Sequence, residues 1–119
     1  MRIGIKRVYD PVSSADGLRV LVDRLWPRGL KKADACVDVW AKEMAPTASL
    51  RKWFAHQEER FSDFRHRYLA ELEEKQDIAM KLLERAAGRP ITLLFAARSR
   101  SCNHAVILQE FLLRQESRG

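Results

Sequence analysis

The first forty residues carry short apolar blocks with the spacing of β-strands. Ile3 and Ile5 alternate with polar neighbours, which predicts a strand over residues 2–9. Residues 18–23 have an uninterrupted apolar centre, a pattern typical of a strand that is buried on both faces. A third strand is predicted over residues 35–40, where the sequence reads ACVDVW. The chain is therefore expected to begin with strands.

From about residue 47 the apolar positions take the spacing of helices. Thr47 or Ser49 can cap a short helix through its side-chain oxygen. Apolar residues at helical intervals then predict a long helix at about 58–87, and a Gly-Arg-Pro sequence ends it. The sequence ITLLFA at 91–96 is again an apolar strand, and a last helix follows a polar loop.

The order of these elements predicts a single small α/β domain over residues 1–119. We expect a short, partly parallel sheet flanked by helices, with the strand at 91–96 at its centre. A composition of 46% hydrophobic and 32% charged residues suits one globular core. No apolar run approaches the roughly 20 residues that cross a bilayer, and the first residues lack a signal-peptide pattern. We therefore expect a cytoplasmic protein with no membrane partner.

Polar side chains gather where the predicted strands end. In open α/β sheets, ligands bind beyond the carboxyl ends of the strands, so these groups meet at one rim if their strands are parallel neighbours. The candidate ligand-binding residues are Tyr9, Asp10, Arg24, Arg28, Arg98, Ser101 and Asn103, and the candidate catalytic residues are Asp23 and His104.

The segment FAARSRSCNH has the chemistry of an anion site. A strand leads there into a helix, whose N-terminal N–H groups favour negative charge. Arginine binds phosphates and carboxylates through paired hydrogen bonds. We expect Arg24, Arg28 and Arg98 to hold a small anionic ligand, and we expect Asp23 to orient these arginines. The alternative is that Ser101 caps the helix while the arginines are solvated or paired internally.

His104 is the candidate acid–base group, because an imidazole titrates near neutral pH and Asp10 or Asp23 can serve as its partner. Together with Asn103 it would contact the reactive or polar end of the ligand. The alternative is a structural histidine that is bonded to a neighbouring backbone carbonyl. Cys102 is disfavoured as a nucleophile, because the arginine of a phosphatase signature is missing. No metal-ligand spacing is present, so neither a metal nor a cofactor is expected. Whether the pocket catalyses a reaction or only binds is left open.

A formal net charge of +6 makes nucleic acid the second candidate partner. The arginines are spread along the chain rather than gathered in a basic tail, so a small anion remains the first. A third interpretation is a non-catalytic structural or interaction module whose strand-end arginines pair internally. The two cysteines, Cys36 and Cys102, do not suggest a disulfide framework, and the sequence does not fix the oligomeric state.

Four segments resemble the YeaO-like family of bacterial proteins, the group of domain of unknown function 488. They read RVYDP, GLRVLVDRLWPRGLKK, LRKWFAH and TLLFAARSRSCNHAVIL, and the resemblance covers almost the whole chain. It implies a compact α/β fold and assigns no activity or cofactor. Ser99 stands where the family motif has an acidic residue, and Asn103-His104-Ala105 stands where longer relatives carry Cys-His-Arg. Both departures weaken mechanisms that need a carboxylate or a cysteine there.

Overall fold

The computed structural model describes residues 2–118, and these form one four-stranded sheet that is parallel throughout. The strands are β1 (Ile3–Arg7), β2 (Leu18–Leu21), β3 (Val39–Trp40) and β4 (Ile91–Phe95). Their order across the sheet is β1-β4-β2-β3, so the last strand of the sequence lies between the first two. The predicted α/β class and the central position of the strand at 91–96 are confirmed.

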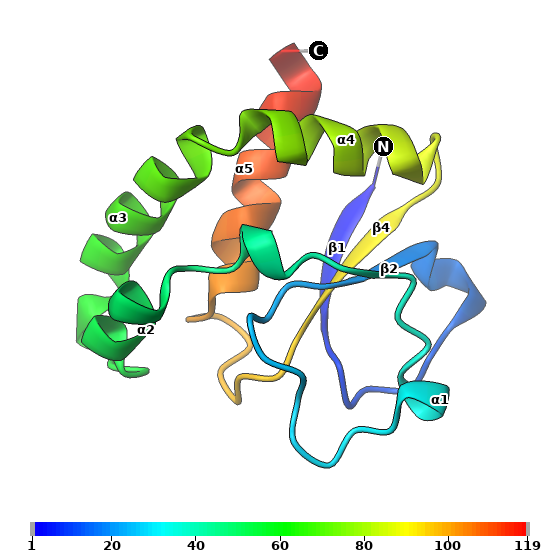
Figure 1. Ribbon diagram of the computed structural model, residues 1–119, viewed down its shortest axis with the longest axis horizontal. Helices are drawn as coiled ribbons and strands as arrows, with labels where there is room; N and C mark the ends of the chain where they lie inside the picture. The colour runs from blue at the N-terminus through cyan, green and yellow to red at the C-terminus, as the bar shows by residue number, and fades with distance from the viewer. Residues whose placement is uncertain (1, 119) are drawn as a thin grey trace.

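Helices follow and separate these strands. They are α1 (Lys32–Ala35), α2 (Ala48–Phe54), α3 (Phe61–Glu73), α4 (Gln76–Ala86) and α5 (His104–Arg118), with short 3-10 turns η1 (Ser14–Asp16), η2 (Lys42–Met44) and η3 (Glu58–Arg60). Figure 1 shows α3, α4 and α5 gathered on one side of the sheet, with α1 on the far side of β2.

Two predicted elements need correction. The single helix expected at about 58–87 is two helices, because Lys75 leaves the helical conformation with φ −121° and ψ 26°. The break redirects the chain, so that Leu72 before it and Ala79 after it are both completely buried. The strand expected at 35–40 is reduced to β3, because α1 and a left-handed residue, Cys36, occupy the start of that segment.

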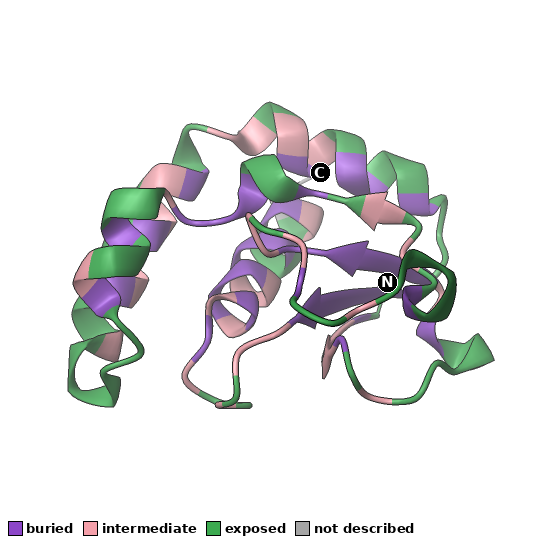
Figure 2. Cartoon of the chain, turned by 60° about the horizontal axis from the view of Figure 1, so that its bottom comes forward, coloured by how far each residue is buried: buried purple, intermediate pink, exposed green. Residues whose placement is uncertain are grey.

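The two faces of the sheet carry cores of different size. Side chains alternate between the faces of a strand, and in β4 Leu93 and Phe95 join the large cluster under α3, α4 and α5. Leu94 points the other way and packs with Val8 and Leu21 in a small cluster beneath the loops. In Figure 2 the central strands β2 and β4 are buried, the outer strands β1 and β3 are mostly half-buried, and the helices are buried on their inner sides. Helices therefore cover one face, and loops cover the other.

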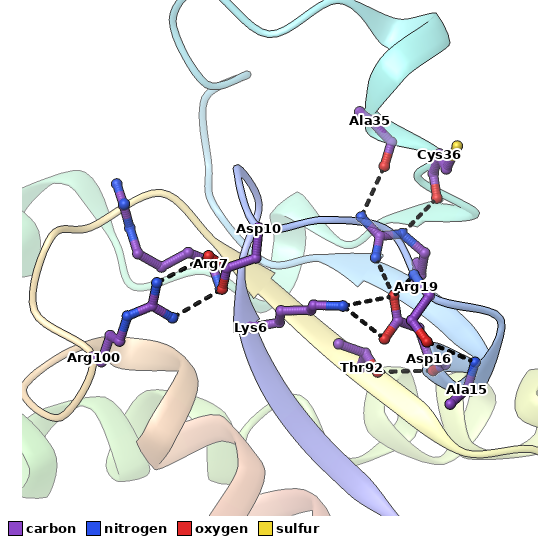
Figure 3. A network of polar contacts seen from close by, with 11 residues as sticks. Lys6, Arg7, Asp10, Ala15, Asp16, Arg19, Ala35, Cys36, Thr92 and Arg100 are labelled. Atoms are coloured by element: carbon purple, nitrogen blue, oxygen red, sulfur yellow. Dashed lines mark hydrogen bonds and ion pairs between the residues drawn. The ribbon is translucent and has the colours of Figure 1, made fainter.

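A buried ionic network holds these loops to the second face (Figure 3). Arg19, which is 4% exposed, pairs with Asp16, and Lys6 Nζ lies 3.0 Å from the same carboxylate. Arg19 also donates to the carbonyls of Ala35 and Cys36, which closes the end of α1. Burial alone would raise the pKa of Asp16, but hydrogen bonds from a backbone N–H, Lys6 and Arg19 together lower it. The carboxylate is thus kept ionised.

Candidate functional site

A cleft of about 1020 Å³ opens at the carboxyl ends of β2 and β4. After β2 the chain turns toward the small cluster, where Trp26 and Leu30 pack. After β4 it turns toward the helical face and enters α5, whose Ala105 and Leu108 belong to the large cluster. Because neighbouring strands diverge to opposite faces here, a crevice is left between them, which is the usual ligand position in open α/β sheets.

Basic and apolar side chains line this cleft together. Its cationic side chains are Arg24, Arg51, Lys52 and Arg98. Among the lining residues of the described chain, the only carboxylates are Asp23 and Glu58. Its larger apolar side chains are Leu25, Pro46, Phe54 and Phe64. A concave site whose charged side chains are mainly cationic concentrates anions, so the cleft can attract an anion and shield apolar surface at the same place.

Arg24 is held in the cleft by backbone carbonyls. Its Nε donates to the carbonyl of Pro46 at 3.2 Å, and its Nη2 lies 3.5 Å from the carbonyl of Ala45. The same loop is fixed from its other side, since the Trp40 indole N–H donates to the Asp23 carbonyl at 2.8 Å. The role of orienting Arg24, which the sequence analysis gave to the Asp23 carboxylate, thus falls to main-chain groups.

Asp23 and His104, the candidate catalytic pair, do contact each other. Asp23 Oδ1 lies 3.1 Å from His104 Nε2, and Asp23 Oδ2 accepts from the Ala96 N–H at 3.1 Å. His104 Nε2 also lies 3.0 Å from the carbonyl of Val22 and forms its aligned hydrogen bond there. The pair therefore joins the end of β2 to the end of β4 and to the start of α5.

Asn103 caps α5. Its Oδ1 accepts from the Val106 N–H at 3.2 Å, while its Nδ2 donates to the Ser99 carbonyl at 2.8 Å. Ser101, the alternative cap considered from the sequence, is exposed and outside the lining of the cleft. Asn103 and His104 line the cleft at the first turn of this 15-residue helix, so the partial positive charge of the helix N-terminus lies beside it.

Tyr9, Asp10 and Arg28 lie outside the lining of the cleft. The Tyr9 hydroxyl donates to the Arg28 carbonyl at 3.0 Å. Asp10 accepts two hydrogen bonds from Arg100, at 2.8 and 2.9 Å, as Figure 3 shows. These bonds lower the pKa of Asp10 to about 2. The cleft thus brings together five of the candidate residues, which are Asp23, Arg24, Arg98, Asn103 and His104. The other four, Tyr9, Asp10, Arg28 and Ser101, lie outside its lining.

Comparison with known proteins identifies the family. The model of the inactive DUF488-N3 subclade matches residues 2–118. The chain belongs to this subclade. Its relatives include the uncharacterized protein YeaO of Escherichia coli (strain K12), 46% identical over 112 residues, which are 94% of this chain and 97% of that protein. The uncharacterized protein Rv3073c of Mycobacterium tuberculosis (strain ATCC 25618 / H37Rv) is 42% identical, over 93% of both chains. The expected YeaO-like membership is confirmed. No solved structure matches.

Sequence reasoning missed the part of the cleft of this DUF488-N3 protein that α2 and the turn after it supply. Arg51, Lys52 and His56 line it, yet they follow no strand and were not candidates. Thr47, one of the two caps predicted for this helix, caps α2 by accepting from the Leu50 N–H at 3.3 Å, and the other, Ser49, lies inside the helix. The available signal was the LRKWFAH string, which carried the family resemblance and contains all three residues.

Within residues 2–118, no group of three or more His, Cys, Asp or Glu side chains is arranged to hold a metal ion. Cys36 and Cys102 are free thiols, and Cys102 lines the cleft. In the same part of the chain, no helix has both the length and the apolar character to cross a membrane. The functional groups that line the cleft are guanidinium, ammonium, imidazole, carboxylate, amide, hydroxyl and thiol groups.

Proposed function

We propose that this protein binds a small phosphate- or carboxylate-bearing ligand, without turnover, in the cleft between β2 and β4. The observation that carries the proposal is the convergence of Arg24, Arg51, Lys52 and Arg98 on a crevice at the divergence of two parallel strands. Each guanidinium can give an anion two parallel hydrogen bonds, which are stronger than bonds between neutral groups.

The cations of the cleft are prepared for a ligand to different degrees. Arg24 is already ordered by the carbonyls of Ala45 and Pro46, so it loses little freedom on binding. Arg51, Lys52 and Arg98 are exposed and free to close over an anion. The N-terminus of α5 adds a fixed partial positive charge at the same edge.

Binding is favoured over catalysis by the subclade and by the contacts of the candidate catalytic pair. The matching family is described as inactive. His104 Nε2 is engaged with Val22 and Asp23, and the other Asp23 oxygen accepts the Ala96 N–H. These contacts support a structural role for the pair, in which it keeps the two strand ends in position around the cleft.

A thermal-shift titration at two salt concentrations tests the proposal, with inorganic phosphate, ribose 5-phosphate, citrate and a short DNA duplex as probes. A probe at about 100 times its Kd adds roughly 2.7 kcal/mol of stability, which corresponds to roughly 10 °C in a domain of this size. We expect a small anion to raise Tm at both salt concentrations. No shift with any anionic probe would contradict the proposal.

Two variants with the same change of charge locate the binding site. Arg98→Ala removes a guanidinium that lines the cleft, whereas Arg85→Ala removes an exposed one from α4, outside it. Loss of a charged hydrogen bond is expected to weaken anion binding about tenfold in Arg98→Ala. Arg85→Ala should bind like the wild type. Equal weakening in both variants would indicate a general charge effect and would remove the support for the cleft.

Nucleic acid remains the second candidate, because exposed cations lie over tryptophan rings outside the cleft. Arg67 and Arg60 lie 4.3 and 5.7 Å from the Trp53 ring, and Lys42 lies 5.1 Å from the Trp40 ring. Such pairs can accept stacked bases. A phosphate-backbone binder loses affinity steeply as salt rises, so stabilisation by DNA at low salt alone would favour this function.

A further inference from the structure

His56 lies at the cleft in a backbone conformation that residues with side chains rarely adopt. Ala55 ends α2 with φ 48°, and His56 follows with φ 56°, so two consecutive non-glycine residues are left-handed. One left-handed residue is enough to end a helix, and the Ala55 N–H already closes α2 on the Arg51 carbonyl at 2.9 Å. The conformation of His56 is therefore an extra cost that glycine would avoid.

This conformation places His56 at the exposed end of a row of rings. Its imidazole centroid lies 6.2 Å from that of Phe54, at an interplanar angle of 51°. Phe54 is stacked in turn on Phe64, with centroids 4.3 Å apart and an angle of 15°. The two phenylalanines are buried and the histidine is exposed, while all three line the cleft. The row thus leads from the core into the cavity.

The cleft also has an exposed aliphatic side chain, Leu25, that is not packed in the core. Leu25 is 65% exposed, directly after the fixed Arg24, and it lines the same cavity. An aliphatic side chain in this position gains most from a ligand with an apolar part, because contact would remove its surface from water. The cations that would hold the anionic part are within the same lining.

We propose that His56, Phe54 and Leu25 form a ring subsite beside the anion-binding groups. The ligand class is then an aromatic ring that carries a phosphate or carboxylate group. This inference rests on the proposed function, since the anionic group anchors the ring. Flat rings pack well against other rings in tilted or offset geometry. A cavity of about 1020 Å³ has room for an aromatic ring together with its anionic group.

Phenyl, hexyl and ethyl phosphate, measured by calorimetry, test the ring subsite. The three share the anion, phenyl and hexyl phosphate have the same number of carbons, and ethyl phosphate lacks most of the apolar surface. We expect phenyl phosphate to bind about tenfold more tightly than ethyl phosphate, because the ring is removed from water. It should also bind more tightly than hexyl phosphate, because a rigid ring loses less freedom on binding.

His56→Gly and Ala55→Gly form a matched pair of variants. Both relieve a left-handed residue, so both should raise Tm and remain folded. Only His56→Gly removes a side chain that lines the cleft. We expect it to reduce the preference for phenyl over ethyl phosphate several-fold, while Ala55→Gly keeps the wild-type preference.

The outcomes separate this inference from the proposed function. Equal affinities for phenyl and ethyl phosphate would overturn the ring subsite and leave anion binding intact. A hexyl phosphate that binds as tightly as phenyl phosphate would show a general apolar subsite and overturn the assignment of a ring. An unchanged ring preference in His56→Gly would overturn the role of His56. Absence of binding by all three phosphates, and by benzoate as a carboxylate probe, would overturn both proposals together.

Discussion

Removal of the Asp16 carboxylate is expected to destabilise the fold strongly. Asp16→Ala deletes the ion pairs with Arg19 and Lys6 and the hydrogen bond from the Ser13 N–H at 3.0 Å. The Arg19 side chain is 4% exposed, so water cannot readily replace the lost partner. Arg19 keeps two carbonyl acceptors but is left with an unpaired buried charge at Nη1. The loss of stability in this variant therefore measures the free-energy penalty of leaving a buried guanidinium without its carboxylate partner.

The size of this effect can be set against a second Asp–Arg pair in the same molecule. Removing one partner of a buried ion pair costs about 3–5 kcal/mol. Asp10 and Arg100 have the same chemistry, but their side chains are 23% and 62% exposed, and water can take over their hydrogen bonds. Figure 3 shows both pairs. Asp10→Ala should therefore cost only a small part of the Asp16→Ala effect.

Urea unfolding and thermal melting, both followed by tryptophan fluorescence, measure both changes. With roughly 4 °C of Tm per kcal/mol for a domain of this size, Asp16→Ala should melt about 12–20 °C below the wild type. Although burial alone would raise the pKa of Asp16, its hydrogen bonds lower it. Its stabilisation is therefore present above pH about 4 and lost as the pH falls. Equal losses in Asp16→Ala and Asp10→Ala, or a difference from wild type that grows on acidification, would refute this reasoning.

Three further changes have defined outcomes. Gly17→Ala should cost about 2–4 kcal/mol in urea unfolding, because Gly17 has φ 65° and an added Cβ would lie 2.1 Å from the Pro90 carbonyl oxygen. Asn103→Ala should cost about 1 kcal/mol, since it removes the cap of α5, and should also weaken anion binding, as calorimetry would detect. Arg100→Ala should return the pKa of Asp10, about 2 in the wild type, toward its ordinary value, as NMR titration of the carboxyl carbon would show. The wild type should be more stable than this last variant at neutral pH, and the difference in stability should disappear as the pH falls toward 2.

The centre of the sheet and part of the cleft could be predicted from local sequence. Residues 91–96 are apolar except for Thr92, which is a pattern typical of a strand covered on both faces, and β4 is buried along its whole length. Once β4 lies between parallel neighbours, residues that directly follow β2 and β4 must meet. Asp23, Arg24, Arg98 and His104 line the same cleft for this reason.

The remaining wall of the cleft depends on packing that the local sequence does not encode. α2 reaches the cleft because it packs on α3, with Phe54 stacked on Phe64 and the Thr47 hydroxyl donating to Glu71 Oε2 at 2.8 Å. No strand-end rule would have selected Arg51 or His56. The break between α3 and α4 likewise has no local signal, since it contains neither glycine nor proline. It follows instead from the direction that α4 takes over the core.

The two residues predicted to be catalytic, Asp23 and His104, each form a hydrogen bond to the main chain at the cleft. β2 and β4 send the chain to opposite faces, so the strand ends need a link if the crevice between them is to keep its width. Asp23 and His104 supply it, through the Ala96 N–H on one side and the Val22 carbonyl on the other. If His104 Nε2 took part in proton transfer, its hydrogen bond to the Val22 carbonyl would have to break. We infer that the Asp–His pair keeps the two strand ends in position and so sets the width of the proposed anion pocket, independently of any reaction.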